Sequence, residues 1–254
     1  MGQKRQETQH PFRPIIGKRL RGYRITNFEV ECPATALAGG ESQFDSFIIK
    51  TLSLLSLTRQ HHYIMEKITT IIELEKAFSI ESLSKITDYD TYFKYLAESL
   101  FENFEIRNGD DVYRFVEIEF YLRKTESESR KIAYERETCA GEWFLHDNGV
   151  DIAFESNKQF YGGILIRSIK KSVSYTVDGE FINGPRKCSW HIFDGLNAFA
   201  HNERITRIEE ASVREQIKSN AFARQGIKDD DKLFRFTIPF ELWNHKGYSG
   251  FPKK

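Results

Sequence analysis

Residues 113–122, Tyr-Arg-Phe-Val-Glu-Ile-Glu-Phe-Tyr-Leu, constrain the fold of this chain more than any other stretch. β-Branched and aromatic residues dominate the run and its polarity alternates, so it predicts a β-strand. Because side chains two residues apart share a face, one face carries Val116, Ile118, Phe120 and Leu122, and the other carries Tyr113, Phe115, Glu117, Glu119 and Tyr121. A carboxylate beside an aromatic ring suits a site that activates water next to a flat ligand. The alternative is an edge strand with two exposed glutamates.

The composition narrows the classes of function. The chain has 254 residues, 40% of them hydrophobic, and equal numbers of basic and acidic residues, which argues against a generally cationic nucleic-acid binder but leaves room for a local patch. Three widely spaced cysteines indicate free thiols in a reducing compartment, so we expect a cytoplasmic (bacterial) or otherwise intracellular protein. No metal-binding or phosphate-loop motif occurs, and we expect neither a metal nor a cofactor.

Residues 1–64 are expected to form an N-terminal extension, loosely structured and making few contacts with the rest of the chain. Their many Lys and Arg residues also fit a basic arm for nucleic acid. The charges are not followed by the apolar core of a secretory signal, and the apolar run 47–57 is too short to span a membrane, so we expect no membrane partner. His61-His62 is either a solvated pair or a metal ligand. Apolar spacing predicts a helical lead-in over 65–88.

From residue 88 the signals are clearer. Asp88 or Asp90 caps a predicted helix, and the turn Asn108-Gly109-Asp110 joins two strands into a hairpin. The remaining predicted elements are a surface loop over 123–141, a hairpin turning at Asp147-Asn148-Gly149, a strand over 164–169, a helix through Trp190 to Leu196, an amphipathic helix over 204–223 and a last strand over 232–238. Arg167 lies within the apolar strand, where a buried arginine needs a carboxylate or phosphate partner.

Four short motifs follow one another at characteristic spacing: Val116-Glu117-Ile118-Glu119-Phe120-Tyr121-Leu122, then Leu165-Ile166-Arg167-Ser168-Ile169, then Gly184-Pro185-Arg186-Lys187, then Arg224-Gln225-Gly226-Ile227 before Arg235-Phe236. In this order they resemble the alkyladenine (3-methyladenine) DNA glycosylase family. The resemblance covers about residues 89–254 and implies an α+β fold, with a curved antiparallel sheet and surrounding helices. This fold is also described as formyltransferase C-terminal-domain-like.

The resemblance implies a base-flipping, monofunctional glycosylase acting as a monomer on damaged DNA. Glu119 matches the general base, and Arg167 matches the arginine that holds the attacking water and a backbone phosphate; an ordinary salt bridge is the alternative for Arg167. Tyr121 matches the ring on which the flipped base stacks. Further substrate-binding positions fall on Trp143, Leu145, His146 and Glu155, and DNA-binding positions fall on Asn148 and Lys187. No metal is needed, because an alkylated purine leaves readily.

Several positions depart from the family pattern. Residues 123–141 contain no histidine, although the family has one that faces the stacking tyrosine. Asn148 stands where the family inserts an aromatic wedge into the duplex, Leu145 stands where it has a pocket aromatic, and Glu155 stands where it has Asn. Without a wedge, we expect a preference for cationic alkylpurines in weakly paired or single-stranded sites. A non-catalytic or respecialised nucleotide-binding or nucleic-acid-binding member of the fold is the second candidate.

Overall fold

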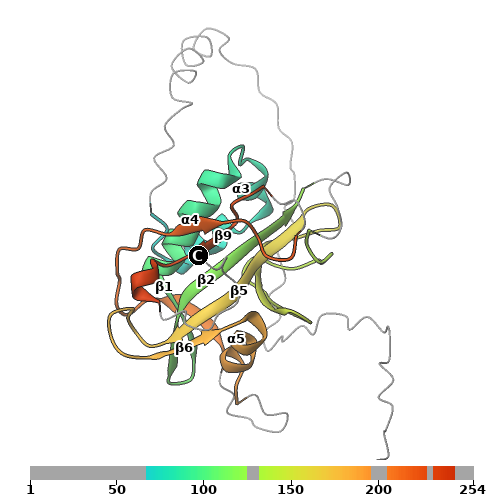
Figure 1. The fold of residues 1–254 in the computed structure, drawn as a ribbon. Helices are drawn as coiled ribbons and strands as arrows, with labels where there is room; N and C mark the ends of the chain where they lie inside the picture. The colour runs from blue at the N-terminus through green and yellow to red at the C-terminus, as the bar shows by residue number, and fades with distance from the viewer. Residues whose placement is uncertain (1–66, 125–131, 196–204, 228–230, 244–254) are drawn as a thin grey trace, which may run out of the picture. The chain divides into compact units, whose positions relative to one another are not determined.

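The structure, a computed structural model, describes residues 67–124, 132–195, 205–227 and 231–243. In these ranges the chain is α+β (Figure 1). Its helices are α2 (Ile71–Ala77), α3 (Ile80–Ser84), α4 (Tyr89–Asn103), α5 (Pro185–Ile192) and the 3-10 helix η1 (Phe240–Leu242). Its strands are β1 (Phe104–Asn108), β2 (Asp111–Arg123), β3 (Trp143–His146), β4 (Gly149–Ala153), β5 (Tyr161–Lys171), β6 (Glu180–Asn183), β7 (Arg207–Glu210), β8 (Asn220–Phe222) and β9 (Arg235–Thr237).

The predicted N-terminal extension lies outside the described residues, as do the apolar run 47–57 and His61-His62. None of the helices in the described ranges is long and apolar enough to cross a membrane.

Two short helices occupy the predicted helical lead-in. Thr70 and Glu73 form a capping box at the start of α2, and Ser79 caps α3. Leu83 is fully buried, and the Phe78 ring meets Phe154 edge-on at 5.2 Å between centroids. The lead-in therefore packs into the same hydrophobic core as the rest of the described chain.

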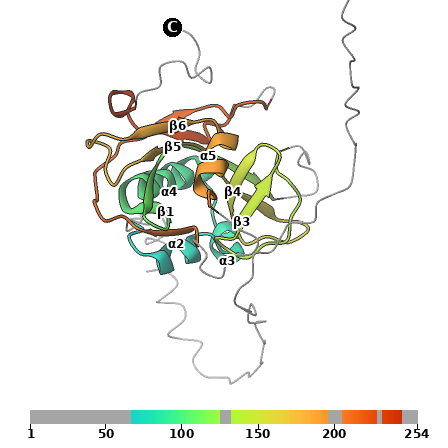
Figure 2. The same cartoon turned by 90° about the horizontal axis from the view of Figure 1, so that it is seen from below.

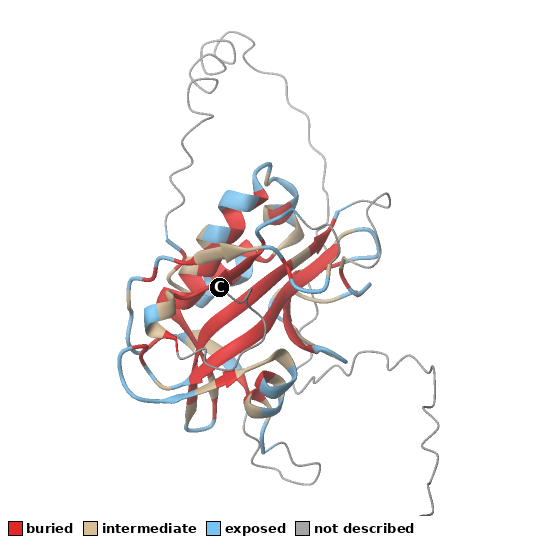
Figure 3. Cartoon of the chain, viewed as in Figure 1, coloured by how far each residue is buried: buried red, intermediate tan, exposed pale blue. Residues whose placement is uncertain are grey.

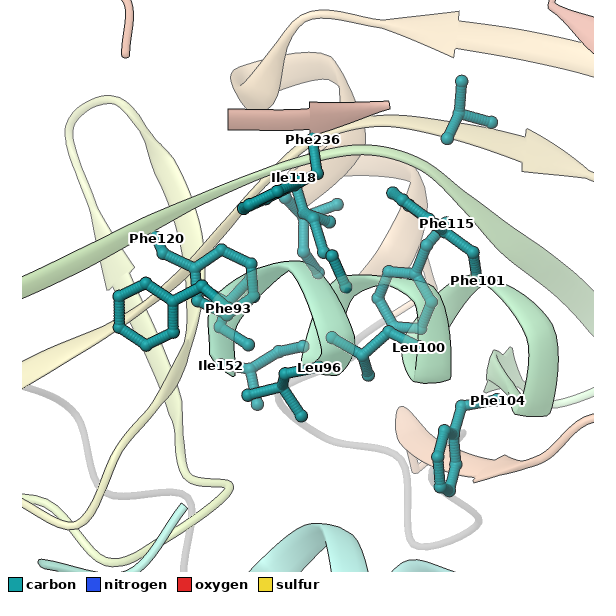
Figure 4. Packing of buried hydrophobic residues seen from close by; sticks show 14 of the residues in the cluster. Phe93, Leu96, Leu100, Phe101, Phe104, Phe115, Ile118, Phe120, Ile152 and Phe236 are labelled. Carbon is teal, nitrogen blue, oxygen red and sulfur yellow. The ribbon is translucent and has the colours of Figure 1, made fainter. Parts of the chain in front are cut away.

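Helix α4 forms the main support of the sheet. Asp88 caps it by accepting a hydrogen bond from the Thr91 amide, as its sequence predicted. The apolar residues at helical spacing are buried, and Figure 4 shows Phe93, Leu96 and Leu100 of α4 beneath Ile118 and Phe120. Phe93 stacks on Phe120 at 4.5 Å between ring centroids. This packing fixes one face of β2 toward the core.

The nine strands of the described residues form one antiparallel sheet whose two longest members, β2 and β5, pair at its centre. β2 also pairs with β1 and, further along, with β9, while β5 also pairs with β4 and β6. Because different neighbours take over along each long strand, the sheet curves around the core (Figures 1 and 2). Figure 3 shows β2 and β5 buried along most of their length.

A β-bulge corrects the simple alternation predicted for 113–122. The pairing of β2 with β5 shifts register between Phe115 and Ile118. One extra residue exchanges the faces of a strand, so Phe115 joins Ile118 in the core rather than sharing a face with Glu117. The alternative of an edge strand with exposed glutamates is wrong, since β2 has partners on both sides.

The amphipathic helix predicted over 204–223 is wrong. This segment contains β7, which pairs with β1, and β8, which pairs with β9. Between these strands, the Ile217 amide donates to Glu102 and the Ser219 amide donates to Glu98. Carboxylates of α4 thus accept the backbone hydrogen bonds that a helix would have satisfied internally. Helix α5 is also shorter than predicted, because it ends at Ile192.

Candidate active site

One row of residues crosses four strands on the same face of the sheet. Asp151 of β4 pairs with Leu165 of β5, which pairs with Glu119 of β2, which pairs with Arg235 of β9. Directly paired residues on antiparallel strands point to the same side. Two strand positions along, Tyr121 pairs with Gly163, which has no side chain to compete for space. The register therefore gathers acidic, basic and aromatic groups at one place.

Glu119 and Arg167 form a buried ion pair, with Oε2 of Glu119 2.6 Å from Nη1 of Arg167. The Tyr121 hydroxyl donates to Oε1 of Glu119 at 2.7 Å, and the Gln225 amide donates to the same oxygen at 2.8 Å. The Gln225 side chain also accepts a hydrogen bond from Arg167. Glu119 and Arg167 therefore point to the same side of the sheet.

A second carboxylate lies behind this pair. Glu117 accepts hydrogen bonds from Nε of Arg167 at 3.1 Å and from Nε of Arg235 at 2.6 Å. It also accepts one from the Ser168 hydroxyl at 3.0 Å. Glu117 and Glu119 are both fully buried. Their charges therefore lie in a region of low dielectric, where attraction between opposite charges is stronger than in water.

Burial raises the pKa of Glu119 above its ordinary value, although the charge of Arg167 and the hydrogen bonds from Tyr121 and Gln225 act in the opposite direction. Burial also raises the pKa of Tyr121, with a further contribution from the Glu119 charge, so its hydroxyl stays protonated and donates. A carboxylate with a raised pKa beside a fixed cation suits a general base.

A cavity with a volume of about 810 Å³ opens over Tyr121 and Arg167. Other lining residues come from four places: the segment before β3 (Ile132, Ala133, Tyr134, Arg136), the β3–β4 hairpin with β4 and β5 (His146, Asn148, Asp151, Leu165), the start of α5 (Asn183, Gly184, Pro185, Arg186, Lys187), and the loop Gln225, Gly226, Ile227. Glu119 does not line this cavity. Its carboxylate contacts Tyr121 and Arg167, which do. The cavity is large enough for a nucleobase.

A buried network supports one wall of this cavity. Asp151 accepts from Nε2 of His146 at 3.0 Å and pairs with Nη2 of Arg136 at 2.8 Å. Burial alone would raise the pKa of Asp151. The hydrogen bond from His146 and the charge of Arg136 together outweigh this effect, so the pKa of Asp151 lies below its ordinary value. Nδ1 of His146 accepts from the Asn148 amide at 3.2 Å. Because both ring nitrogens are occupied, His146 holds the hairpin turn in place.

The tip of the β3–β4 hairpin lies at the cavity. Asn148 is exposed there, and its side-chain amide donates to the Tyr134 hydroxyl at 2.9 Å. The Tyr134 ring lies 4.7 Å from the His146 ring. Tyr134 belongs to the predicted surface loop over 123–141, of which 125–131 lie outside the described residues. The loop thus contributes an exposed phenol next to the tip.

The start of α5 forms the part of the rim next to the hairpin turn. Gly184 precedes the helix with φ of 106°, a conformation that favours glycine. Arg186 and Lys187 are both exposed in the first turn, and Nε of Arg186 donates to the Asp147 carbonyl at 2.7 Å. The rim therefore presents two cations and the free amides of a helix start, which attract anionic groups.

Three residues expected to bind substrate lie elsewhere. Trp143 donates to the Thr206 carbonyl at 3.0 Å and packs edge-on against Phe193. Glu155 accepts from the Ile80 amide at 2.8 Å, so it caps the start of α3. Leu145 is exposed and lines a second hollow of about 710 Å³ between the hairpin and α5. Trp143 therefore has a packing role and Glu155 a capping role, and neither lines the cavity.

The sequence did not single out Arg136, Asp151 and Gln225 as site residues. Asp151 gave a signal, because it is an acid inside the apolar run 150–154. Gln225 lies within the fourth motif, Arg224-Gln225-Gly226-Ile227, to which no role was assigned. Arg136 lies in a charged segment with no periodicity, so nothing in the sequence separates it from its neighbours.

Within the described ranges, no group of three or more His, Cys, Asp or Glu residues is arranged to hold a metal ion. In comparisons with known proteins, no family model matches the chain. A search of curated protein sequences finds no significant match either.

Proposed function

We propose that this protein is a DNA base-excision glycosylase that hydrolyses the N-glycosidic bond of alkylated purines. The observation that carries the proposal is the buried Glu119–Arg167 pair, hydrogen-bonded to Tyr121 beneath a cavity of nucleobase size. The finer fold assignment, to the alkyladenine DNA glycosylase type, is part of the same proposal. The α+β class and the curved antiparallel sheet support it.

In the proposed reaction, a flipped purine enters the cavity and its ring stacks on Tyr121. Glu119 takes a proton from a water molecule whose oxygen attacks the sugar C1′. The N-glycosidic bond breaks, and its electron pair leaves with the base, which is neutral after departure if it carried an alkyl cation. In this reaction Arg167, which lines the cavity, stabilises the negative charge of Glu119 before proton transfer and orients the water.

The rim of the cavity supports a nucleic-acid partner. Arg186 and Lys187 are exposed at the start of α5, where helix amides also attract phosphate. Asn148 offers no stacking surface at the hairpin tip, so the partner of this proposal is damaged DNA in weakly paired or single-stranded form. The proposal includes a monomeric protein that acts within the cell.

One observation favours a second candidate, a non-catalytic member of the fold that binds a nucleotide or single strand. Oε1 of Glu119 already accepts two hydrogen bonds and Oε2 pairs with Arg167. Glu119 is also fully buried. Water must displace one of these partners before Glu119 acts as a base, whereas binding alone needs no such change.

Release of alkylated bases from methylated DNA separates the two candidates. The wild type is expected to release them, and Glu119→Gln is expected to lose at least about 100-fold in rate because the base is gone. Glu137→Gln, an exposed glutamate off the cavity, is the matched control and keeps full activity. Binding of methylated single strands by the wild type without any release of base would favour the non-catalytic candidate.

A further inference from the structure

Four charged side chains are buried together next to the cavity, and one of them, Arg167, lines it. Glu117 and Glu119 have no exposed surface, and Arg167 and Arg235 are 6% and 4% exposed. Two carboxylates and two guanidinium groups make this group of four neutral as a whole. Buried charges are tolerated only when they are paired, and loss of one partner leaves an uncompensated charge.

The pairing within the group is uneven. Glu117 accepts from Nε of both arginines, whereas Glu119 pairs with Nη1 of Arg167. Arg167 therefore bridges the two carboxylates through different nitrogens, which fixes the plane of its guanidinium. Arg235 is paired through Nε with Glu117, although it is directly opposite Glu119 in the sheet register.

We propose that Glu117 is the positioning residue of the Glu119 base: it fixes the orientation of Arg167 and balances the charge of Arg235. This inference rests on the proposed function, because it explains how Glu119 remains basic next to two arginines. Both guanidinium charges act on Glu119, and the Glu117 carboxylate that contacts both arginines offsets part of their effect. Without the Glu117 carboxylate, the two arginines act on Glu119 at full strength, and Glu119 loses basicity.

None of the other groups described around Glu119 balances the charges of Arg167 and Arg235 as Glu117 does. Tyr121 on the same strand donates a hydrogen bond, and the Gln225 loop donates another. Arg224 lies over the Tyr121 ring at 5.5 Å, and Asp151 on β4 is paired with Arg136 and His146. On the α5 side, burial raises the pKa of the Cys188 thiol, so it adds no charge beside Glu117. Glu117 is thus the carboxylate that contacts both arginines of the group.

The test removes the charges of the group one at a time. Glu117→Gln keeps the size and leaves an excess positive charge, so the pKa of Glu119 falls and the acid limb of the rate profile moves to lower pH. Arg235→Met leaves an excess negative charge, so the limb moves to higher pH. The double variant restores neutrality and returns the limb to near the wild-type position. Misplacement of Arg167 also lowers kcat of Glu117→Gln by about 10- to 100-fold.

A purely structural role predicts a different pattern. Both single variants would then lose activity without moving the limb, or would move it in the same direction, and either result would overturn the proposal. If Glu117→Gln does not fold, the comparison of Arg235→Met with the neutral double variant gives the same decision, because adding Glu117→Gln to Arg235→Met must lower the pKa of Glu119.

A second readout does not depend on activity. The carboxyl carbon of Glu119 is titrated by NMR in the free full-length protein, with its signal assigned by its loss in Glu119→Gln. Opposite movements of this titration in Glu117→Gln and Arg235→Met support the positioning role, and unchanged titrations overturn it. A wild type that releases no base but shows these movements would contradict the proposed glycosylase function alone.

Discussion

Tyr121 contributes two separate groups to the candidate site. Its ring lines the cavity, and its hydroxyl hydrogen-bonds Glu119 at 2.7 Å. The hydroxyl hydrogen bond stabilises the charged carboxylate and so lowers the pKa of Glu119 against the opposing effect of burial. Binding and base strength are therefore separable at this one residue.

We predict that Tyr121→Phe moves the acid limb of the rate profile to higher pH while KM stays near the wild-type value. Loss of the hydroxyl raises the pKa of Glu119, so more of it is protonated at neutral pH and activity recovers as the pH rises. Tyr121→Ala is the control, since loss of the ring raises KM by about 10-fold or more, the scale of one stacked base. A loss of activity in Tyr121→Phe that is equal at every pH would contradict this assignment.

Asp151 links the wall of the cavity to stability. It is buried and paired with both Arg136 and His146. Its pKa is below the ordinary value in the folded protein, so its stabilising effect is complete above that value, near 3.8, and disappears as the pH falls through the lower folded-state pKa.

We predict that Asp151→Asn lowers the free energy of unfolding by about 3–5 kcal/mol at neutral pH, because Arg136 is left as an unpaired buried cation. Urea unfolding at neutral and strongly acidic pH measures this, and the difference from wild type should shrink in acid. Asp147→Asn, an exposed neighbour in the same hairpin, should change stability by less than about 0.5 kcal/mol. A difference for Asp151→Asn that does not depend on pH would show that the ion pair is not its cause.

Among the elements, the β3–β4 hairpin would decide, in the proposed function, which form of DNA the site accepts. Its turn residues Asp147 and Asn148 were predicted from the sequence, and His146 and Tyr134 hold the turn against the cavity. An exposed Asn at this tip has little surface with which to fill the gap that a flipped base leaves.

We predict that Asn148→Tyr raises activity on duplex DNA more than activity on single strands, because an aromatic side chain offsets the cost of unstacking. Base release from matched duplex and single-stranded substrates measures the ratio. Asn148→Ala, which loses only the bond to Tyr134, is the control for disturbance of the tip and should not raise duplex activity. Equal gains on both substrates would mean that position 148 is not next to the duplex gap.

The elements whose signals are local were predicted well from the sequence. The Asp88 cap of α4, the turn at Gly109 and the Asn148 hairpin each depend on a few neighbouring residues. The strands within segment 204–223 were not predicted from the sequence, because they form by pairing with β1 and β9, which are distant in the chain. The segment also depends on carboxylates of α4, which accept hydrogen bonds from its amides. No periodicity within a segment carries that information.

In the candidate site, too, local motifs were predicted from the sequence and contacts between distant segments were not. Glu119, Tyr121 and Arg167 were predicted together from strand motifs, and the β2–β5 register brings them into contact. The bulge after Phe115 was not predicted, since it depends on the partner strand. The partners of Glu117 and Asp151 were not predicted either, because each ion pair joins residues distant in the sequence.

At the scale of the whole molecule, charge limits how the proposed glycosylase would attract nucleic acid. The chain has 37 basic and 37 acidic residues, so no general positive field draws DNA to it. Several of its arginines are also engaged internally, as Arg136, Arg167 and Arg235 are with buried carboxylates. In the part of the chain that the structure describes, the cations placed to attract DNA in the proposed function are those at the rim of the cavity, chiefly Arg186 and Lys187.

We therefore predict a shallow salt dependence for binding of single-stranded DNA, with a slope of log K against log salt between about −1.5 and −3, which corresponds to two to four phosphate contacts. Lys187→Ala should reduce the magnitude of this slope by about 0.7, the value for one phosphate on a single strand. Lys158→Ala removes the same charge from an exposed position off the cavity and should leave the slope unchanged. If Lys187→Ala and Lys158→Ala change the slope equally, the net charge of the protein governs binding, and the cations at the rim of the cavity do not. A much steeper slope for the wild type would require a basic surface beyond Arg186 and Lys187.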